Sequence, residues 1–500
     1  MNRALKRMSV AILVMFLLLM INVNYLQGFD TGKLAALPFN SRTLENQVRY
    51  QRGEILTADG KVIAKSVPSN DFYKWQRVYP YRDVYAPVTG FYSLYGATGG
   101  IEQADDSVLA GGDSSLAVRN FIDMITGKQR KGANVQTTIV SSVQQAAYDG
   151  LQSKLQGTGF MGGVVAIEPS TGKILALASY PSYDPNKLAV HDGKQLNIND
   201  AATQGAPGQP RRDHAINDLF PPGSTFKIVT SSAFFNQDGT RNAQTSVASP
   251  SQLTFSDTTS VLTNDQGEVC GNGSGQAPII VAFAQSCDTT FGKIGEDLGT
   301  GVLNSTAAAF GMNSDTLTIP MPVTQSNYVQ APGPSTTAFS AIGQYSDTVT
   351  PLQEAMFSAA IANGGQLMKP YLVQTITAGD YSKIQETTPS TLGQAVSSQV
   401  ASEVSQMMQA VVQTQQGTAF GFNQNAEGGV NISGKTGTAQ NGVNNSHLDD
   451  AVFTAFAPGN GNPKIAVGVI LQGGGYGATA AAPIAVQVIK AYLAYLQGNP

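Results

Sequence analysis

Charged side chains are scarce in this sequence of 500 residues. Asp, Glu, Lys and Arg make up 13% of it, about half of the roughly 25% that is usual for a soluble domain. The net charge of −4 and the scattered cations provide no basic field that would collect phosphates. The composition therefore argues against a nucleic-acid partner. Its 42% of apolar residues indicates a folded chain, with a length that suits roughly two to four domains.

Cysteine and histidine are also rare, with two and three residues. The histidines lie far apart in polar sequence, and there is no C-x-x-C or metal-spaced Cys/His cluster, so we expect no metal site. Cys270 and Cys287 are equally compatible with a disulfide in an oxidising compartment and with two buried thiols. The motif G-x-S-x-G is missing as well, which argues against a Ser-His-Asp hydrolase.

A long apolar segment lies near the start of the chain. Three cations within the first seven residues precede an apolar run from Met8 to Leu26. At about 1.5 Å per residue this run reaches ~28 Å, close to the ~30 Å of a hydrocarbon core. No A-x-A site follows directly, which favours an uncleaved single-pass anchor over a signal peptide. The flanking cations are expected to stay cytoplasmic, which predicts that residues 28–500 lie outside the membrane.

Turn residues and periodicity divide the next part of the chain. Residues 28–50 are interpreted as a juxtamembrane linker, and residues 51–66 as a hairpin that turns at Asp59-Gly60. Residues 141–155 have the pattern of an amphipathic helix. The glycine-rich segment 157–163 that follows marks a domain boundary.

The remaining sequence begins and ends with strands. Residues 162–180 predict strand, turn and strand, residues 186–215 predict a polar loop, and a helix begins near Pro221. Three more strand-like segments and a closing helix follow, at 430–440, 449–459, 464–473 and 483–496. Strands at both ends with helices between them predict an α/β (α+β) domain whose terminal strands share one sheet.

One predicted helix carries a lysine among apolar residues. Ser224 begins this helix, and Lys227, the only charge before Gln237, follows one turn later on the same face. Burial would lower the pKa of the amine, which could then take the serine proton. Alternatively, Ser224 caps the helix and Lys227 reaches to water. The spacing alone does not decide, because Ser170 and Lys173 share it inside a hairpin turn.

Two more motifs follow in order. Ser286-Cys287-Asp288 ends an apolar segment, and Lys435-Thr436-Gly437-Thr438 lies in a predicted strand. The order S-x-x-K, S-x-N/D and K-T-G occurs in penicillin-recognising serine enzymes, and the chain resembles the class B penicillin-binding proteins. The segments that look like those of the family are RGEI…DG (52–60), YGATGGIE (95–102), GGVVAIEPSTGKILALASYPSYDPN (162–186), FPPGSTFK (220–227), IGQ…VTPLQ (342–353), IANGG (361–365) and GKTGTA (434–439).

The resemblance implies a membrane-anchored peptidoglycan D,D-transpeptidase, which cross-links stem peptides through a serine acyl-enzyme and is acylated by penicillin. It implies a cytoplasmic tip and transmembrane helix at 1–27, a linker and mixed non-catalytic pedestal at 28–158, and a transpeptidase domain at 159–495. That last domain would have a mainly antiparallel sheet flanked by helices and would lie outside the bacterial cell membrane.

The resemblance also implies roles for the motif residues. Ser224 would be the nucleophile and Lys227 its base. Ser286 would relay the proton to the leaving amine, and Asp288 would orient the substrate and Lys227. The implied substrate-binding residues are Lys435 and Thr436 for the terminal carboxylate, Gly437 for a strand edge open to a peptide, and Thr438, whose N–H forms an oxyanion hole with that of Ser224.

Asp288 departs from the asparagine found in much of the superfamily. An ionised carboxylate accepts hydrogen bonds but cannot donate one. Beside Lys227 it would favour the ammonium, which is the wrong protonation state for a base. The sequence therefore leaves the path of the proton open.

A complete P-loop pattern, G-x-x-x-x-G-K-[ST], runs from Gly429 to Thr436. Strand and turn residues follow it where a P-loop requires a helix, so we do not expect a nucleotide site. No cofactor is expected. The expected ligands are stem peptides and, as inhibitors, β-lactams. By analogy the partners are a SEDS-family glycan polymerase and other division or elongation proteins. The alternatives are a D,D-carboxypeptidase, a β-lactamase-like hydrolase, and a non-catalytic penicillin sensor or scaffold.

Overall fold

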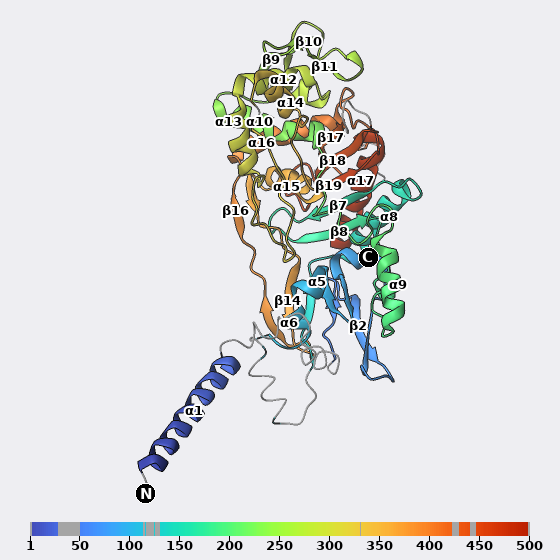
Figure 1. Ribbon diagram of the computed structural model, residues 1–500. Helices are drawn as coiled ribbons and strands as arrows, with labels where there is room; N and C mark the ends of the chain where they lie inside the picture. The colour runs from blue at the N-terminus through green and yellow to red at the C-terminus, as the bar shows by residue number, and fades with distance from the viewer. Residues whose placement is uncertain are drawn as a thin grey trace.

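The computed structural model describes residues 3–28, 51–113, 116, 125, 131–330, 332–422, 430–440 and 447–498. The predicted juxtamembrane linker lies outside these residues, except for Gly28. Figure 1 shows the N-terminal helix at one end of the molecule, then a first sheet, then a second sheet, and a group of helices at the far end.

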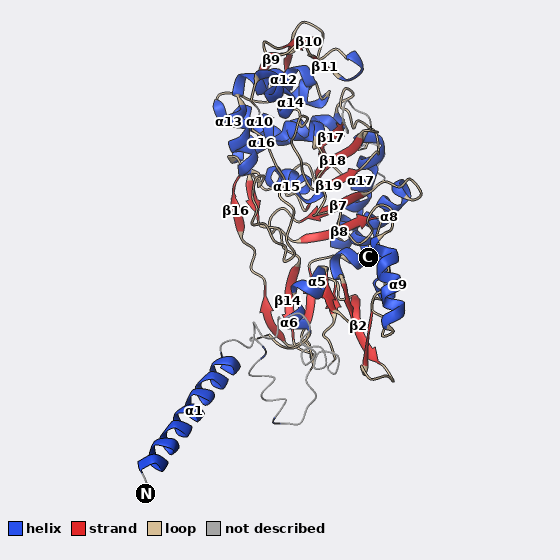
Figure 2. Ribbon diagram, in the orientation of Figure 1, coloured by secondary structure: helices blue, strands red, loops and turns tan. Residues whose placement is uncertain are grey.

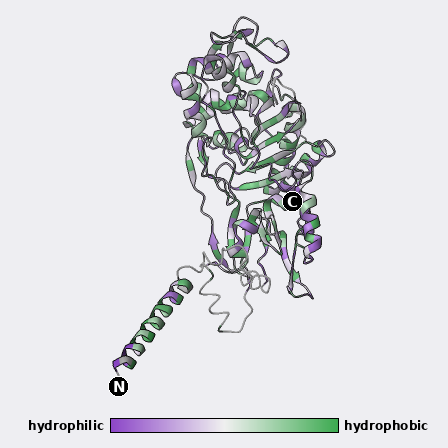
Figure 3. Cartoon of the chain, in the orientation of Figure 1, coloured by the Kyte–Doolittle hydropathy of each residue, from purple (hydrophilic) through white to green (hydrophobic). Residues whose placement is uncertain are grey.

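The predicted anchor is a helix, α1 (Arg3–Gly28). Its apolar stretch Leu5–Leu26 has a mean hydropathy of 2.2 and none of it is buried, as expected for a helix that faces lipid. Figure 3 shows apolar residues along most of its length. The C-terminal helix α17 (Gly477–Leu496) is also long and apolar, but half of it is buried, so it is a core helix.

A six-stranded sheet follows α1 in the chain. The predicted hairpin is confirmed, since β1 pairs antiparallel with β2 and Leu56 lies opposite Val62. The order of the sheet is β15-β14-β6-β1-β2-β3. Its strands are β1 (Ile55–Leu56), β2 (Val62–Pro68), β3 (Trp75–Val78), β6 (Asn134–Thr137), β14 (Val373–Thr377) and β15 (Lys383–Glu386).

Two of these strands come from far along the chain. Strand β14 pairs antiparallel with β6, with Ile376 opposite Val135, and β15 continues the sheet beyond it. The sequence analysis placed no strand in this segment. The pairing means that residues 373–386, which lie within the predicted transpeptidase range, complete a sheet that begins in the predicted pedestal.

The second sheet has five antiparallel strands in the order β17-β18-β19-β7-β8. Strands from both ends of this part of the chain therefore share one sheet, as predicted. Helices α8 and α17 pack together on this sheet, and α15 packs against its central strands (Figure 2). The elements are β7 (Gly162–Ile167), β8 (Ile174–Tyr180), β17 (Ser433–Ala439), β18 (Asp450–Ala457), β19 (Ile465–Leu471), α8 (Ser141–Leu155) and α15 (Pro351–Ala362).

The predicted loop over 186–215 is wrong in part, because it contains a helix, α9 (Gly193–Gln204). Asp192 caps this helix by accepting hydrogen bonds from the backbone N–H groups of Lys194 and Gln195. Leu196 is its only buried residue. A helix with so little apolar surface leaves no 3.6-residue pattern in the sequence.

The other helices gather at the end of the molecule opposite α1 (Figure 1). They are α10 (Lys227–Gln237), α11 (Ile279–Ala284), α12 (Asp288–Leu298), α13 (Thr300–Ala309), α14 (Pro334–Ala341) and α16 (Ser398–Gln413). Short elements complete the fold: η1 (Arg82–Tyr85), α4 (Ala86–Thr89), β4 (Phe91–Ser93), β5 (Gly96–Thr98), α5 (Gly100–Ala104), α6 (Asp106–Leu109), η3 (Pro185–Lys187), η4 (Gly223–Phe226), β9 (Ser246–Ala248), β10 (Gln252–Thr254), β11 (Val261–Thr263), η5 (Asp265–Gly267), β12 (Gln276–Pro278), β13 (Gln366–Met368) and β16 (Thr391–Gln394).

Candidate active site

Ser224 lies on a tight turn between the five-stranded sheet and the helical end of the molecule. The turn is the 3₁₀ helix η4, which leads directly into α10. It packs on strand β17 at Gly437, where an added Cβ would lie 2.9 Å from the Pro222 carbonyl oxygen. Gly223 has a φ of +56° and its N–H donates to Gly343, so a residue without a side chain suits this bend. Ser224 is not the N-cap residue of either helix, because Pro222 holds that position in η4 and Phe226 in α10.

Lys227 is fully buried and its amine faces Ser224. Its Nζ lies 2.9 Å from Ser224 Oγ, 3.1 Å from Ser286 Oγ and 2.7 Å from the Ser286 carbonyl oxygen. Asp288 Oδ1 is 2.6 Å away and completes the set of oxygens around the amine. Lys227 therefore does not reach to water, and the S-x-x-K residues meet on one face of the turn.

Two opposing influences act on the Lys227 amine. Burial, the larger one, lowers the pKa of Lys227, while the carboxylate of Asp288 and the more distant charge of Asp265 raise it. The balance leaves the pKa below its ordinary value. A lowered pKa makes the neutral amine more accessible near neutral pH, and the neutral amine is the form that takes a proton from a hydroxyl.

Ser286 lies between the two lysines of the motifs. Its hydroxyl is within hydrogen-bond distance of Lys227, as above, and accepts a 2.9 Å hydrogen bond from Lys435 Nζ. The residue has a φ of +61°, which is uncommon for a residue with a side chain and costs conformational energy. The tight turn between α11 and α12 thus holds the hydroxyl of Ser286 where both amines reach it.

Lys435 is also fully buried, on strand β17. Its amine donates to Ser286 and to the carbonyl oxygen of Thr436, 2.8 Å away. Burial and, to a lesser extent, the positive charge of Lys227 lower the pKa of Lys435 well below its ordinary value, against a smaller opposing effect of Asp288. Lys435 thus belongs to the same charged cluster as the S-x-x-K and S-x-D residues.

Two threonines, Thr436 and Thr438, flank Gly437 in the segment Lys435–Thr438. Thr436 is buried, and its hydroxyl lies 2.6 Å from that of Thr418. Thr438 is half-buried, as Ser224 is. Strand β17 is the last strand of its sheet, so its outer edge pairs with no other strand within the described residues. Because Lys435 and Thr436 lie inside a strand, the P-loop pattern has no helix N-terminus.

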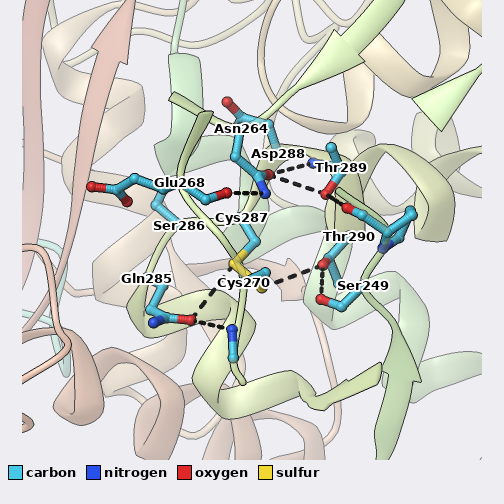
Figure 4. Close-up of a disulfide and its surroundings, with 12 residues drawn as sticks. Ser249, Asn264, Glu268, Cys270, Gln285, Ser286, Cys287, Asp288, Thr289 and Thr290 are labelled. Atoms are coloured by element: carbon cyan, nitrogen blue, oxygen red, sulfur yellow. Dashed lines mark hydrogen bonds between the residues drawn. A yellow bond between two sulfur atoms is a disulfide. The ribbon is translucent and has the colours of Figure 1, made fainter. Parts of the chain in front are cut away.

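A disulfide joins Cys270 to Cys287, which decides between the two alternatives left open by the sequence (Figure 4). Cys287 stands between Ser286 and Asp288, so the bond ties the S-x-D motif to the loop after η5. Hydrogen bonds reinforce the link, because the Asn264 side chain accepts from the backbone N–H of Thr289 and the Gln285 side chain accepts from that of Gly271 (Figure 4).

The sequence analysis missed one buried carboxyl beside the site. Glu354 on α15 is 0% exposed and contacts the hydroxyl of Thr225, the residue after Ser224. The sequence contains a weak sign of it, since Glu354 is the only charge in the apolar segment Pro351–Ala362. Within the described residues there is no group of three His, Cys, Asp or Glu side chains that could hold a metal ion.

Comparison with known families agrees with this geometry. The family described as the penicillin binding protein transpeptidase domain matches residues 162–490, a range that includes all three motifs. The chain belongs to the class B penicillin-binding proteins. A second family, the penicillin binding protein A dimerisation domain, matches residues 52–135.

Relatives of this penicillin-binding protein match it over its whole length. Peptidoglycan D,D-transpeptidase PbpA of Mycolicibacterium smegmatis is 41% identical over 499 residues, which is 99% of each chain. PbpA of Mycobacterium tuberculosis is 38% identical and the match covers 100% of both chains.

Solved structures agree with the fold. Penicillin-binding protein A from M. tuberculosis, as a ceftriaxone acyl-enzyme complex, superimposes with a TM-score of 0.84 at 36% identity, over 90% of this chain and 100% of that one. The penicillin G acyl-enzyme complex of that protein gives a TM-score of 0.82 at 37% identity, over 89% of this chain and 100% of that one.

Proposed function

We propose that Ser224 is the nucleophile of this class B penicillin-binding protein, which is a peptidoglycan D,D-transpeptidase. The observation that carries the proposal is the 2.9 Å contact between Ser224 Oγ and the buried amine of Lys227. Full-length similarity to two proteins named as peptidoglycan D,D-transpeptidases supports it.

In the first half of the reaction, Ser224 Oγ attacks the carbonyl carbon of the D-Ala-D-Ala bond as Lys227 takes its proton. The carbon–nitrogen bond breaks, and the D-alanine amine leaves with a proton that Ser286 relays from Lys227. In the second half, an amine of a neighbouring stem peptide attacks the ester. Its proton returns by the same residues, and Ser224 Oγ is released as a hydroxyl.

The residues of strand β17 would hold the substrate. Thr438 is half-buried near the turn of Ser224, and its N–H with that of Ser224 would stabilise the oxyanion, worth ~2.7–4 kcal/mol per donor. The outer edge of β17 would pair with the peptide backbone. Lys435 and Thr436 would bind the terminal carboxylate, with Lys435 turning from Ser286 to do so.

A β-lactam would acylate Ser224 in the same way, because its amide resembles the donor peptide bond. Acyl-enzyme structures of the M. tuberculosis relative with ceftriaxone and penicillin G support this step. A degenerate scaffold would be expected to lack Ser224, Lys227 or Lys435, and all three are here and in contact through Ser286.

For the rest of the chain we propose α1 as the single membrane anchor, with the catalytic part outside the cell membrane. Residues 28–158 would form the linker and pedestal and residues 159–495 the transpeptidase domain, with β14 and β15 reaching back into the pedestal sheet. A SEDS-family glycan polymerase and other division or elongation proteins are the proposed partners.

The test is intact-mass spectrometry of the full chain after treatment with benzylpenicillin, followed over time. We expect a persistent adduct that maps to Ser224 and is absent from Ser224→Ala. Ser170→Ala is the matched control, since Ser170 and Lys173 share the S-x-x-K spacing but lie at the β7–β8 turn, where Ser170 is exposed. An adduct that forms and quickly hydrolyses would favour a carboxypeptidase or β-lactamase-like hydrolase, and no adduct in folded protein would favour a scaffold.

A second assay identifies the acceptor. With a donor stem peptide and an amine acceptor, a transpeptidase yields the cross-linked product and free D-alanine. A carboxypeptidase yields free D-alanine and the shortened donor alone, which would overturn the proposed reaction but not the role of Ser224.

A further inference from the structure

A buried carboxyl lies directly behind the turn that carries Ser224. Glu354 Oε1 is 2.8 Å from the hydroxyl of Thr225, and this hydroxyl is also 2.8 Å from the Pro222 carbonyl oxygen. The other carboxyl oxygen, Oε2, is buried and has no hydrogen-bond partner in the described part of the chain. Thr225 therefore links the helix α15 to the residue two positions before Ser224.

The number of protons in this chain of contacts is limited. A threonine hydroxyl carries one proton, and a backbone carbonyl only accepts. If Thr225 donates to Pro222, the contact with Glu354 is a hydrogen bond only when Glu354 carries the second proton. If Glu354 were ionised, one of the two 2.8 Å contacts would hold no proton at all.

The surroundings of Glu354 favour the protonated form. Burial raises the pKa of Glu354 to about 8, although the hydrogen bond with Thr225 acts in the other direction. An ionised carboxylate with one oxygen unpaired in the interior would be costly, whereas a neutral acid leaves only a weak acceptor unpaired.

The helix that carries Glu354, α15, is held against strands β18 and β19 by close contacts. At Gly468 on β19, an added Cβ would lie 2.4 Å from the backbone nitrogen of Ala355 and 2.8 Å from Glu354 Cβ, so α15 and the sheet are in close contact. The hydroxyl of Thr454 donates a 2.5 Å hydrogen bond to the Glu354 carbonyl oxygen. Thr454 lies opposite Lys435 in the pairing of β18 with β17. Glu354 is thus fixed to β18 and β19, and β18 is the strand that pairs with the K-T-G strand β17.

We propose that Glu354 is a positioning residue: as a neutral acid it donates to Thr225, whose hydroxyl then holds the Pro222 carbonyl and fixes the turn of Ser224. Glu354 does not touch Ser224 itself. It couples the position of the nucleophile to the helix α15 and, through it, to the strand of Lys435. This inference rests on the proposed role of Ser224 as the nucleophile.

The kinetic test compares Glu354→Gln, Glu354→Leu and Thr225→Val by the acylation of each full-length variant with a fluorescent penicillin. Gln keeps a donor for Thr225, so we expect acylation within about twofold of the wild type. Leu removes the donor, and we expect the first-order acylation step to slow roughly 10- to 100-fold with little change in the binding constant, as for a misplaced nucleophile. In a Thr225→Val background, Glu354→Leu is expected to have no further effect, because the link is already broken.

Two results would overturn the inference: equal acylation by the Leu and Gln variants, or full additivity of Glu354→Leu with Thr225→Val. A direct readout is the infrared difference spectrum of wild type minus Glu354→Gln at neutral pH. We expect a protonated carboxyl C=O band, and a carboxylate band in its place would also overturn the inference. This spectrum does not depend on activity, so wild-type protein that shows the band but is never acylated would refute the proposed function and leave the protonation of Glu354 intact.

Discussion

Lys227 Nζ lies 2.6 Å from Asp288 Oδ1, yet the pKa of this lysine is below its ordinary value. Burial has a larger effect on this pKa than the Asp288 carboxylate, which raises the pKa but does not bring it back to its ordinary value. Burial of the amine thus acts against the effect of the aspartate and favours the neutral form of Lys227 more than in a free lysine. In the proposed mechanism Asp288 would moderate the basicity of Lys227 and, through its hydrogen bond, orient the amine toward Ser224.

Replacing Asp288 by asparagine tests this balance. Asp288→Asn removes the charge that raises the pKa of Lys227, so the pKa falls further. The neutral amine then persists to lower pH, and the acidic limb of the acylation profile is expected to shift down by roughly one pH unit. The measurement is the second-order acylation rate with a β-lactam across the acidic and neutral range.

Asp297→Asn is the matched control, because Asp297 lies on the same helix and pairs with Lys293 at the surface. Its profile should coincide with that of the wild type. A limb that stays in place or moves upward in Asp288→Asn would show that Lys227 is not the group that titrates.

The site was predictable from the sequence because its chemistry is local. Ser224 and Lys227 are one helical turn apart, and the other two motifs are short segments with fixed order. The shared sheet could also be predicted, since strand-like segments at both ends of a domain must bury their apolar faces together. The contact of Lys435 with Ser286 joins that sheet to the turn between α11 and α12, and no local pattern in the sequence specifies it.

The features that could not be predicted from the sequence depend on contacts between residues that lie far apart in the chain. Strand β14 reaches the first sheet across more than two hundred residues, and its half-buried pattern is too short to predict a partner. Glu354 is recognisable as buried only once α15 is known to pack on Gly468. The disulfide, too, could be assigned only after the fold brought Cys270 beside Cys287.

Removal of that disulfide is expected to affect both stability and acylation. The bond closes a loop with a sequence separation of 17, so Cys270→Ser/Cys287→Ser should lower the free energy of unfolding by about 3 kcal/mol. It also frees the segment that holds Ser286 and Asp288, which should slow acylation by a β-lactam under conditions where the protein stays folded. Denaturant unfolding and the acylation rate are the two measurements, and wild-type values for both would contradict the role of the bond in holding the motif.

The buried ion pairs of Glu102 with Arg52 and Arg77 at the first sheet should affect the stability of the fold and not the acylation rate. Glu102 is fully buried and accepts 2.6 Å hydrogen bonds from Arg52 Nε and Arg77 Nε. Glu102→Gln leaves the buried guanidinium group of Arg77 without its carboxylate and leaves Arg52 with Asp106 alone, which should cost about 3–5 kcal/mol of unfolding free energy. The acylation rate of the folded fraction should not change. Glu386→Gln breaks an exposed pair with Lys383 and, as the control, should leave the free energy of unfolding nearly unchanged.

The same carboxyl predicts a pH dependence of stability. Burial alone would raise the pKa of Glu102, but the two arginines outweigh it and the pKa is lowered. A pKa that is lower in the folded state gives stability that is complete above the unfolded pKa and lost as the pH falls toward the folded one. Glu102→Gln should therefore unfold with a weaker dependence on acidic pH than the wild type, and identical slopes would contradict this assignment.

Gly437→Ala tests the packing of the Ser224 turn on strand β17. The new methyl group would lie 2.9 Å from the Pro222 carbonyl oxygen and 3.1 Å from Thr225 Cγ2, so the turn must move by a few tenths of an ångström. Because a small misplacement of a nucleophile has a large kinetic cost, acylation should slow by roughly tenfold or more. Gly393→Ala is the matched control, since Gly393 also lies in a strand but has no atom within 4 Å of its added Cβ. Equal acylation rates in the two variants, measured with the same β-lactam, would mean that the turn adapts without moving Ser224.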